Sequence, residues 1–248
     1  MRVMVAFGPT SGGPLLSGDE DGNATPDGLR MPVNPCDEVA LEQALRWRET
    51  GLAREILAVS CGSVASQDQL RTALAMGADR ALLVAAGAAL EPLLMAKLLK
   101  AVAQRENVSL VLLGARASDG EARQIPQMLA AMLGWPQATD ASGLRLEAPG
   151  VCVRRELDHS HEWLGLTLPA VVGVDPMLVR PRSADLCSGK PIIFESAEAL
   201  AADLSPRLLR LALAKAPQRK PGARVDSART LVDRLQAEGL LSVQEDTR

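Results

Sequence analysis

Short apolar runs alternate with segments of helical periodicity through the first half of the chain. The runs are bounded by turn-forming residues, which is typical of parallel strands buried on both faces. Buried strands are expected at 3–7, 56–60, 81–84 and 108–113. Helices, whose apolar residues recur every three to four positions, are expected at 37–50, 67–76, 90–105 and 121–134. This alternation predicts an α/β fold with a mostly parallel, twisted sheet flanked by helices.

The pattern changes after Pro136. Three shorter runs with a turn at 158–161 predict an antiparallel hairpin region, and a last buried strand is expected at 170–174. The three short runs lie at 144–146, 151–157 and 163–168.

The last part of the chain is rich in proline and arginine. A short helix is expected near 197–204, then a linker at 217–223 and an amphipathic helix near 228–238. We expect an α/β nucleotide-binding domain at 1–216 and an extended C-terminal arm at 217–248 that packs on a partner chain, because the arm is too short to form a core.

Composition narrows the class of protein. The chain has 248 residues and 47% hydrophobic residues, which suffices for one large domain. A net charge of −3 and the lack of a basic stripe argue against nucleic acid binding. The four cysteines form no CxxC pair and no leader segment is evident, so a reduced, cytoplasmic protein is expected. The most apolar stretch, 81–99, is interrupted by charges, which argues against membrane insertion.

The candidate ligand site lies beyond the carboxyl ends of the strands, where open α/β sheets bind their ligands. Three segments follow strands there, at 8–37, 60–66 and 114–127. The first contains Asn34-Pro35-Cys36-Asp37-Glu38, which from the residues alone is an ordinary helix start. In the second, residues 60–63 form either a simple turn or a place where a ring or phosphate approaches the backbone.

The third segment combines small residues and Gly120 with the start of a helix. Free amides at a helix N-terminus form a natural phosphate site, to which Arg116 and Arg123 would add positive charge. An N-capped helix with solvated charges explains the same residues equally well.

No reaction centre is evident. GxSxG, HExxH and P-loop motifs are absent, and no GxGxxG follows the first strand. His159 and His161 flank a turn without further metal ligands nearby. The residues predict a ligand cleft without catalysis and without a metal.

Several stretches, in order and over nearly the whole chain, resemble the beta subunit of electron transfer flavoproteins. Residues 34–38 are similar to the family's Asn-Pro-Phe-Asp-Glu, and residues 70–80 match a characteristic run almost letter for letter. The segments 134–139, 168–172 and 217–222 also fit. The resemblance implies a fold like that of the adenine nucleotide alpha hydrolases.

The resemblance also implies a heterodimer whose alpha subunit carries the redox-active FAD, while this chain holds a structural AMP. The residues that match the family's AMP site are Ala6, Asn34, Pro35, Cys36, Asp37, Cys61, Gly114, Ala115, Arg116, Ala117, Ser118, Asp119, Gly120, Glu121, Ala122, Arg123, Gln124 and Ile125. The phosphate would then lie at the amides that begin the helix expected at 121.

Partner contacts follow from the same resemblance. The stretch 180–186 is similar to a loop that grips flavin-dependent dehydrogenases, with Leu186 as the anchor and Arg182 beside it. Glu156 matches an acidic residue near the mobile FAD domain. The implied function is electron relay from these dehydrogenases to an acceptor such as a membrane quinone oxidoreductase.

Three rival functions stay open at this point. Asp119-Gly120 is similar to bifurcating family members, which bind a second FAD where others bind AMP. Cys36 replaces the family's aromatic residue, and residues 119–126 differ from its Asp-Asp-Asp-x-Asn-Gln-Thr-Gly. A non-redox adenine-nucleotide-binding module is the second rival function, and an independent enzyme is the third.

Overall fold

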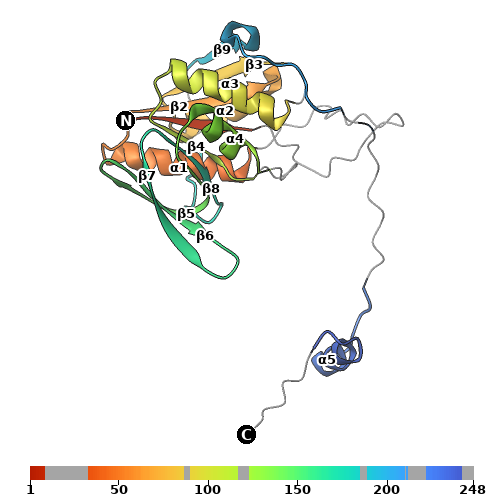
Figure 1. Ribbon diagram of the computed structural model, residues 1–248. Coiled ribbons are helices and arrows are strands. Elements are labelled where there is room, and N and C mark those ends of the chain that lie inside the picture. The colour runs from red at the N-terminus through yellow and green to blue at the C-terminus, as the bar shows by residue number, and fades with distance from the viewer. Residues whose placement is uncertain are drawn as a thin grey trace. The chain divides into compact units, whose positions relative to one another are not determined.

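The structure is a computed structural model that describes residues 1–8, 33–86, 90–116, 123–184, 189–209, 211 and 222–241 (Figure 1). Contacts divide the chain into two compact units, Met1–Leu211 and Ala212–Arg248. The boundary expected after residue 216 lies outside the described residues. The arm's packing on an alpha subunit stays a prediction.

A nine-stranded sheet, with the order β7-β6-β5-β8-β4-β1-β2-β3-β9, forms the centre of the first unit. Its strands are β1 (Arg2–Phe7), β2 (Glu55–Gly62), β3 (Arg80–Ala85), β4 (Leu110–Gly114), β5 (Gln137–Glu147), β6 (Gly150–Glu156), β7 (His161–Thr167), β8 (Ala170–Val174) and β9 (Ile192–Ser196). Among these described strands, the β5–β6 and β6–β7 pairs are antiparallel and the other pairs are parallel. The expected α/β fold with a mostly parallel sheet is confirmed.

Helices cover both faces of this sheet, as Figure 1 shows. They are α1 (Pro35–Glu49), α2 (Gln67–Met76), α3 (Pro92–Arg105) and α4 (Ile125–Leu133), with the 3-10 turns η1 (Val64–Ser66) and η2 (Ala197–Leu200); the second unit contains α5 (Ala228–Ala237). Alternate strand residues point to opposite faces. In β1, Val3 and Val5 pack with α1 and α2, whereas Met4 and Ala6 pack with α3 and α4. Burial on both faces explains the unbroken apolar runs.

Three sequence expectations were wrong in detail, and one strand was not expected. The helix expected from 121 is described from Ile125, and Arg123 just before it has a positive φ of 49°. The run at 144–146 belongs to a longer strand, β5, whose first residues pair in parallel with β8. Strand β9 was not anticipated. The helix expected at 197–204 is the short turn η2, which ends at Ala201 with a φ of 49°.

The chain direction across the sheet reverses between β1 and β4. From β1 the chain proceeds through β2 to β3 with α1 and α2 on one face, and α3 then returns it to β4 on the other face. Parallel α/β sheets bind ligands at the carboxyl ends of strands where such a reversal occurs. In this chain that position lies beyond Phe7 and Gly114.

Candidate functional site

Asp37 bridges the two strand ends at the reversal point. Its Oδ2 accepts the amide of Gly8 at 2.9 Å, and its Oδ1 accepts the amide of Gly114 at 2.9 Å. Gly8 directly follows β1, and Gly114 ends β4. The side chain is buried, with 3% of the residue exposed. One carboxyl group therefore ties α1 to both strands that flank the expected crevice.

The start of α1 explains why Asp37 reaches this position. Pro35 occupies the first turn, and the carbonyl of Asn34 accepts the amides of Asp37 and Glu38. The side chain of Asn34 makes no cap bond; instead, its Nδ2 donates to the carbonyl of Arg116 at 2.8 Å. The backbone of Asn34 thus begins the helix in the ordinary way, while its side chain joins α1 to the chain after β4. The helix dipole favours a carboxylate in this first turn.

Gly114 is required by this close approach. A Cβ added there would lie 2.5 Å from Oδ1 of Asp37, 2.7 Å from Cβ of Cys36 and 2.8 Å from Nδ2 of Asn34. Ordinary contacts of a Cβ atom are 3.4 Å or longer. Two of the segments that the sequence assigned to the site, 34–37 and 114–116, are therefore brought together in direct contact.

Burial dominates the titration of the groups at this edge. It raises the pKa of Asp37 to about 7, against the opposing effect of the amides of Gly8 and Gly114. Burial also raises the pKa of the Cys36 thiol, and the negative charge of Asp37 raises it further. Burial raises the pKa of Cys61 to about 12. Both cysteines are neutral thiols near pH 7, which makes them poor nucleophiles.

Arg116 carries a positive charge directly after the end of β4. Its Nη2 donates to Oδ2 of Asp175 at 3.1 Å, and Oδ1 of Asp175 accepts the amide of Met177. This hydrogen bond to Asp175 raises the pKa of Arg116. The Nε of Arg116 is buried without a hydrogen-bond partner, although 37% of the side chain is exposed. The buried Nε–H of Arg116 therefore has no hydrogen-bond acceptor among the described residues.

Arg123 and Asp140 form a second ion pair near the start of α4. Their side chains lie 3.6 Å apart, and both residues have positive φ angles, of 49° and 54°. Such a conformation is uncommon for residues other than glycine. Pro126 in the first turn of α4 lacks an amide hydrogen, and Gln124 caps the helix without a side-chain bond. The described start of α4 thus offers fewer free amides than the sequence predicted.

The remaining site candidates are more dispersed. Ala6 and Cys61 are buried on the α3 and α4 face, Ala115 donates its amide to Val174, and Ile125 packs against the same core as Ala6. Ala117, Ser118, Asp119, Gly120, Glu121 and Ala122 lie outside the described residues. Sequence reasoning missed Asp175, although an acidic residue directly after a buried strand was an available signal.

The docking candidates have contacts within the chain. Arg182 donates from Nε to Glu42 at 2.7 Å and from Nη1 to Glu49 at 2.7 Å, both on α1. Glu156 accepts from the hydroxyl of Ser142 at 2.6 Å at the end of β6. Leu186 lies outside the described residues. Their roles at partner interfaces stay predictions.

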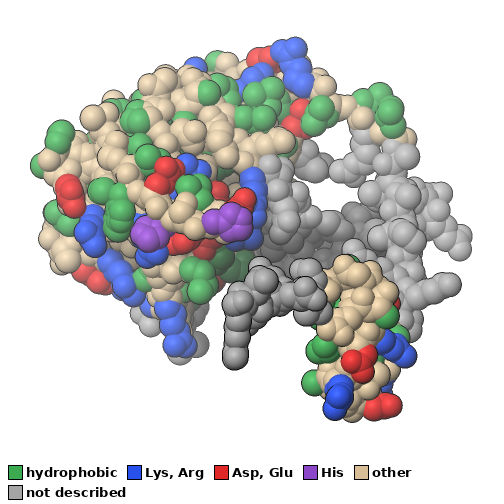
Figure 2. All heavy atoms as spheres, turned by 60° about the horizontal axis from the view of Figure 1, so that its bottom comes forward, with side chains coloured by type: hydrophobic (Ala, Val, Ile, Leu, Met, Phe, Trp, Pro, Cys, Tyr) green, Lys and Arg blue, Asp and Glu red, His purple; other side chains and the backbone are tan. Residues whose placement is uncertain are grey.

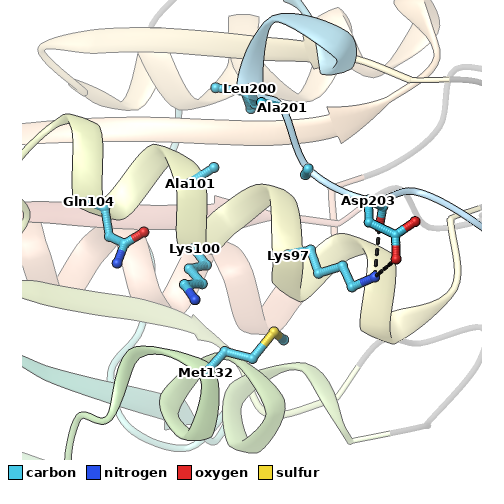
Figure 3. Close-up of a pocket in the computed structure, with 9 residues that line it drawn as sticks. Lys97, Lys100, Ala101, Gln104, Met132, Leu200, Ala201 and Asp203 are labelled. Atoms are coloured by element: carbon cyan, nitrogen blue, oxygen red, sulfur yellow. Dashed lines mark hydrogen bonds and ion pairs between the residues drawn. The ribbon is translucent and has the colours of Figure 1, made fainter.

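A surface cavity of about 370 Å³ lies elsewhere, between α3, α4 and the segment after η2 (Figure 3). Lys97 reaches across it to Asp203, while Lys100 and Met132 contribute to its wall. Its lining residues include none of the strand ends, so this cavity is separate from the candidate site at β1 and β4.

Figure 2 shows basic, acidic and histidine side chains mixed on one face of the molecule, without a patch of a single charge. Within the described ranges, no group of three His, Cys, Asp or Glu side chains could hold a metal ion. No helix of the described part is long and apolar enough to cross a membrane.

Comparison with known proteins identifies the family. The Electron transfer flavoprotein domain matches residues 25–202. The electron transfer flavoprotein subunit beta of Dictyostelium discoideum is 39% identical over 231 residues, which cover 91% of this chain and 92% of that protein. The Bos taurus subunit beta is 42% identical over 89% of this chain and 90% of its own length. The Homo sapiens subunit beta is 41% identical over 86% of this chain and 87% of its own length. The chain belongs to the family of electron transfer flavoprotein beta subunits.

Proposed function

We propose that this chain is the non-catalytic half of a heterodimer with an electron transfer flavoprotein alpha subunit. The alpha subunit carries the FAD that accepts electrons from flavin-dependent dehydrogenases and passes them to an acceptor such as a membrane quinone oxidoreductase. This chain holds a structural AMP and supplies the docking loop around Leu186. A cytoplasmic location stays a prediction.

The observation that carries the nucleotide proposal is the contact between segments 34–37 and 114–116 at the reversal point, where parallel α/β sheets bind ligands. The carboxyl ends of β1 and β4 meet there, and Arg116 follows β4 with a side chain that is 37% exposed. A phosphate group would satisfy an arginine donor better than water does in a partly buried place. An adenine nucleotide at this edge would place its phosphate near the positive charge of Arg116.

The chain's own residues act by shape and charge. Asp37 and Asn34 fix the position of α1 against the end of β4. Asp175 orients the guanidinium of Arg116. The neutral Cys36 and Cys61 fill space and do not react. AMP adds no redox chemistry, so the nucleotide completes the packing of the crevice.

The direct test is to purify the heterodimer, denature it and identify the released nucleotides. One FAD and one AMP per heterodimer supports the proposal. Two flavins and no AMP would assign the chain to the bifurcating type. A chain that stays monomeric beside a co-expressed alpha subunit would instead favour a non-redox nucleotide-binding module.

The docking role has its own test in Leu186→Ala, with Leu52→Ala as control. Leu52 is also a leucine on the surface, 48% exposed. Leu186→Ala should slow reduction of the heterodimer by the dehydrogenase roughly tenfold or more, the effect of a binding hot spot, and leave flavin content intact. Flavin loss in this variant, or equal slowing by Leu52→Ala, would contradict the docking role.

A further inference from the structure

The cavity of about 370 Å³ beside α3 is lined by three separate parts of the chain (Figure 3). Helix α3 contributes Lys97, Lys100 and Gln104, which lie on one side of the helix because they are three and four positions apart. Met132 of α4 and residues 200–203, which follow β9, form the walls. Small-molecule sites usually enclose about 300–1,000 Å³. The cavity is therefore large enough for a small ligand.

The two lysines of this cavity differ in their partners. Lys97 donates from Nζ to the carbonyl of Asp203 at 2.7 Å and to its Oδ2 at 3.0 Å. The same Oδ2 accepts from Nη2 of Arg207 at 3.2 Å. No hydrogen bond or ion pair joins Lys100 to another described residue, and its side chain points toward α4 in Figure 3. Asp203 is the one acid among the described lining residues, so the charge of Lys100 is not balanced within the cavity.

The walls of the cavity are mostly apolar. Met132, Leu200 and Ala202 are partly buried and pack against the hydrophobic core on the α3 and α4 face of the sheet. Such a concave apolar surface favours a ligand that removes an apolar chain from water. Lys100 and the side-chain amide of Gln104 can both donate hydrogen bonds to an anionic group. The lining thus combines one unpaired cation with an apolar wall.

We propose that this cavity binds a small organic carboxylate with a short apolar chain, with Lys100 as the contact of the carboxylate. The chain lies against Met132 and Leu200. One carboxylate matches the one unpaired lysine, whereas a cationic ligand would meet two lysines. The site is independent of the nucleotide and of the docking segment, because its lining includes neither the strand ends at β1 and β4 nor residues 180–186.

NMR of the purified heterodimer, with isotope-labelled methionine methyl groups in this chain, tests the site. Met132 lies in the cavity wall, and its signal is identified by its absence from the spectrum of Met132→Gln. Sodium hexanoate is the probe, hexanol provides the chain without the charge, and sodium acetate provides the charge without the chain. We expect a saturable shift of the Met132 signal with hexanoate, weaker binding of hexanol, and no saturable shift with acetate at the same concentrations.

Lys100→Gln removes the charge and keeps a polar side chain. It should weaken hexanoate binding roughly fivefold, the effect of a partly exposed ion pair, and leave hexanol binding unchanged. Arg71→Gln is the matched control, because Arg71 is also a cation on the surface of a helix and lies outside the cavity lining. It should change the binding of neither ligand.

A Met132 signal without a saturable response to hexanoate would overturn the site, and so would acetate that binds as tightly as hexanoate. Equal hexanoate affinity of Lys100→Gln and wild type would overturn the role of Lys100. If Lys100→Gln failed to fold, the wild type would still decide the matter, since equal affinity for hexanol and hexanoate would overturn the carboxylate contact.

Discussion

Gly114→Ala places a methyl group where α1 and β4 touch. The new Cβ would lie 2.5 Å from Oδ1 of Asp37, about 1 Å closer than an ordinary van der Waals contact, and within 2.8 Å of two further atoms. The first turn of α1 must therefore move, which weakens the bonds from the amides of Gly8 and Gly114 to Asp37. Overpacking costs about 1–3 kcal/mol, and a buried hydrogen-bonding group left without its partner costs about 1–3 kcal/mol. The expected loss in unfolding free energy is about 3–5 kcal/mol.

Urea unfolding followed by circular dichroism measures this loss, because a shift in midpoint at constant slope reports stability alone. Gly165→Ala is the matched control, since Gly165 is also in a strand and a Cβ there would have no atom within 4 Å. It should change stability by less than about 1 kcal/mol. If Gly114→Ala lost less than about 1 kcal/mol as well, the contact between Asp37 and β4 would not be as tight as described.

Three further predictions concern other parts of the chain. The pKa of Asp37 is raised from 3.8 to about 7, so its contribution to the unfolding free energy is full below pH 4 and falls as the pH rises to 7, by at most about 4 kcal/mol. The unfolding free energies of wild type and Asp37→Asn should therefore change differently with pH between pH 4 and 7. Parallel slopes would refute the raised pKa. Arg182→Ala should lower the unfolding free energy by about 2 kcal/mol, because it removes a partner of Glu42, whose side chain is 4% exposed. Urea unfolding measures this loss. An equal loss in the exposed control Arg71→Ala would argue against the ion pair as the cause. Helix α5 has no buried residues, so Leu231→Asp should change the unfolding free energy by less than about 0.5 kcal/mol. The same variant should weaken association with the alpha subunit in analytical ultracentrifugation. Unchanged association would exclude this face of the arm as the contact.

The central strands and helices could be predicted because burial on both faces leaves an unbroken apolar run. Strand β9 could not be recognised by that rule, since Ile193 and Phe194 are 42% and 53% exposed at the sheet edge. The first residues of β5, Gln137–Asp140, are mostly polar or small and become a strand by pairing with β8. Such pairing is decided by tertiary contacts, which local propensity does not contain.

The proximity of two candidate segments was predictable, whereas the details of their contact were not. The rule that ligands bind where an α/β sheet reverses direction indicated the segments 34–37 and 114–116, and the structure joins them. The rule did not indicate that both carboxyl oxygens of Asp37 would accept hydrogen bonds from backbone amides, because the packing of α1 against β4 sets that contact. The start of α4 was misplaced because an arginine with positive φ, Arg123, precedes it.

The segment proposed as the docking loop is flanked on both sides by residues that bind the sheet domain. Arg182 is bound to two glutamates of α1, and Lys190 donates to the carbonyl of Ala78 at 2.8 Å. Arg182 and Lys190, on either side of this segment, are therefore each bound to the sheet domain. A partner that grips it would lose less chain entropy on binding than it would with a free tail. If the proposed docking role holds, substitutions at Arg182 or Lys190 should alter dehydrogenase affinity even without direct contact between these side chains and the dehydrogenase.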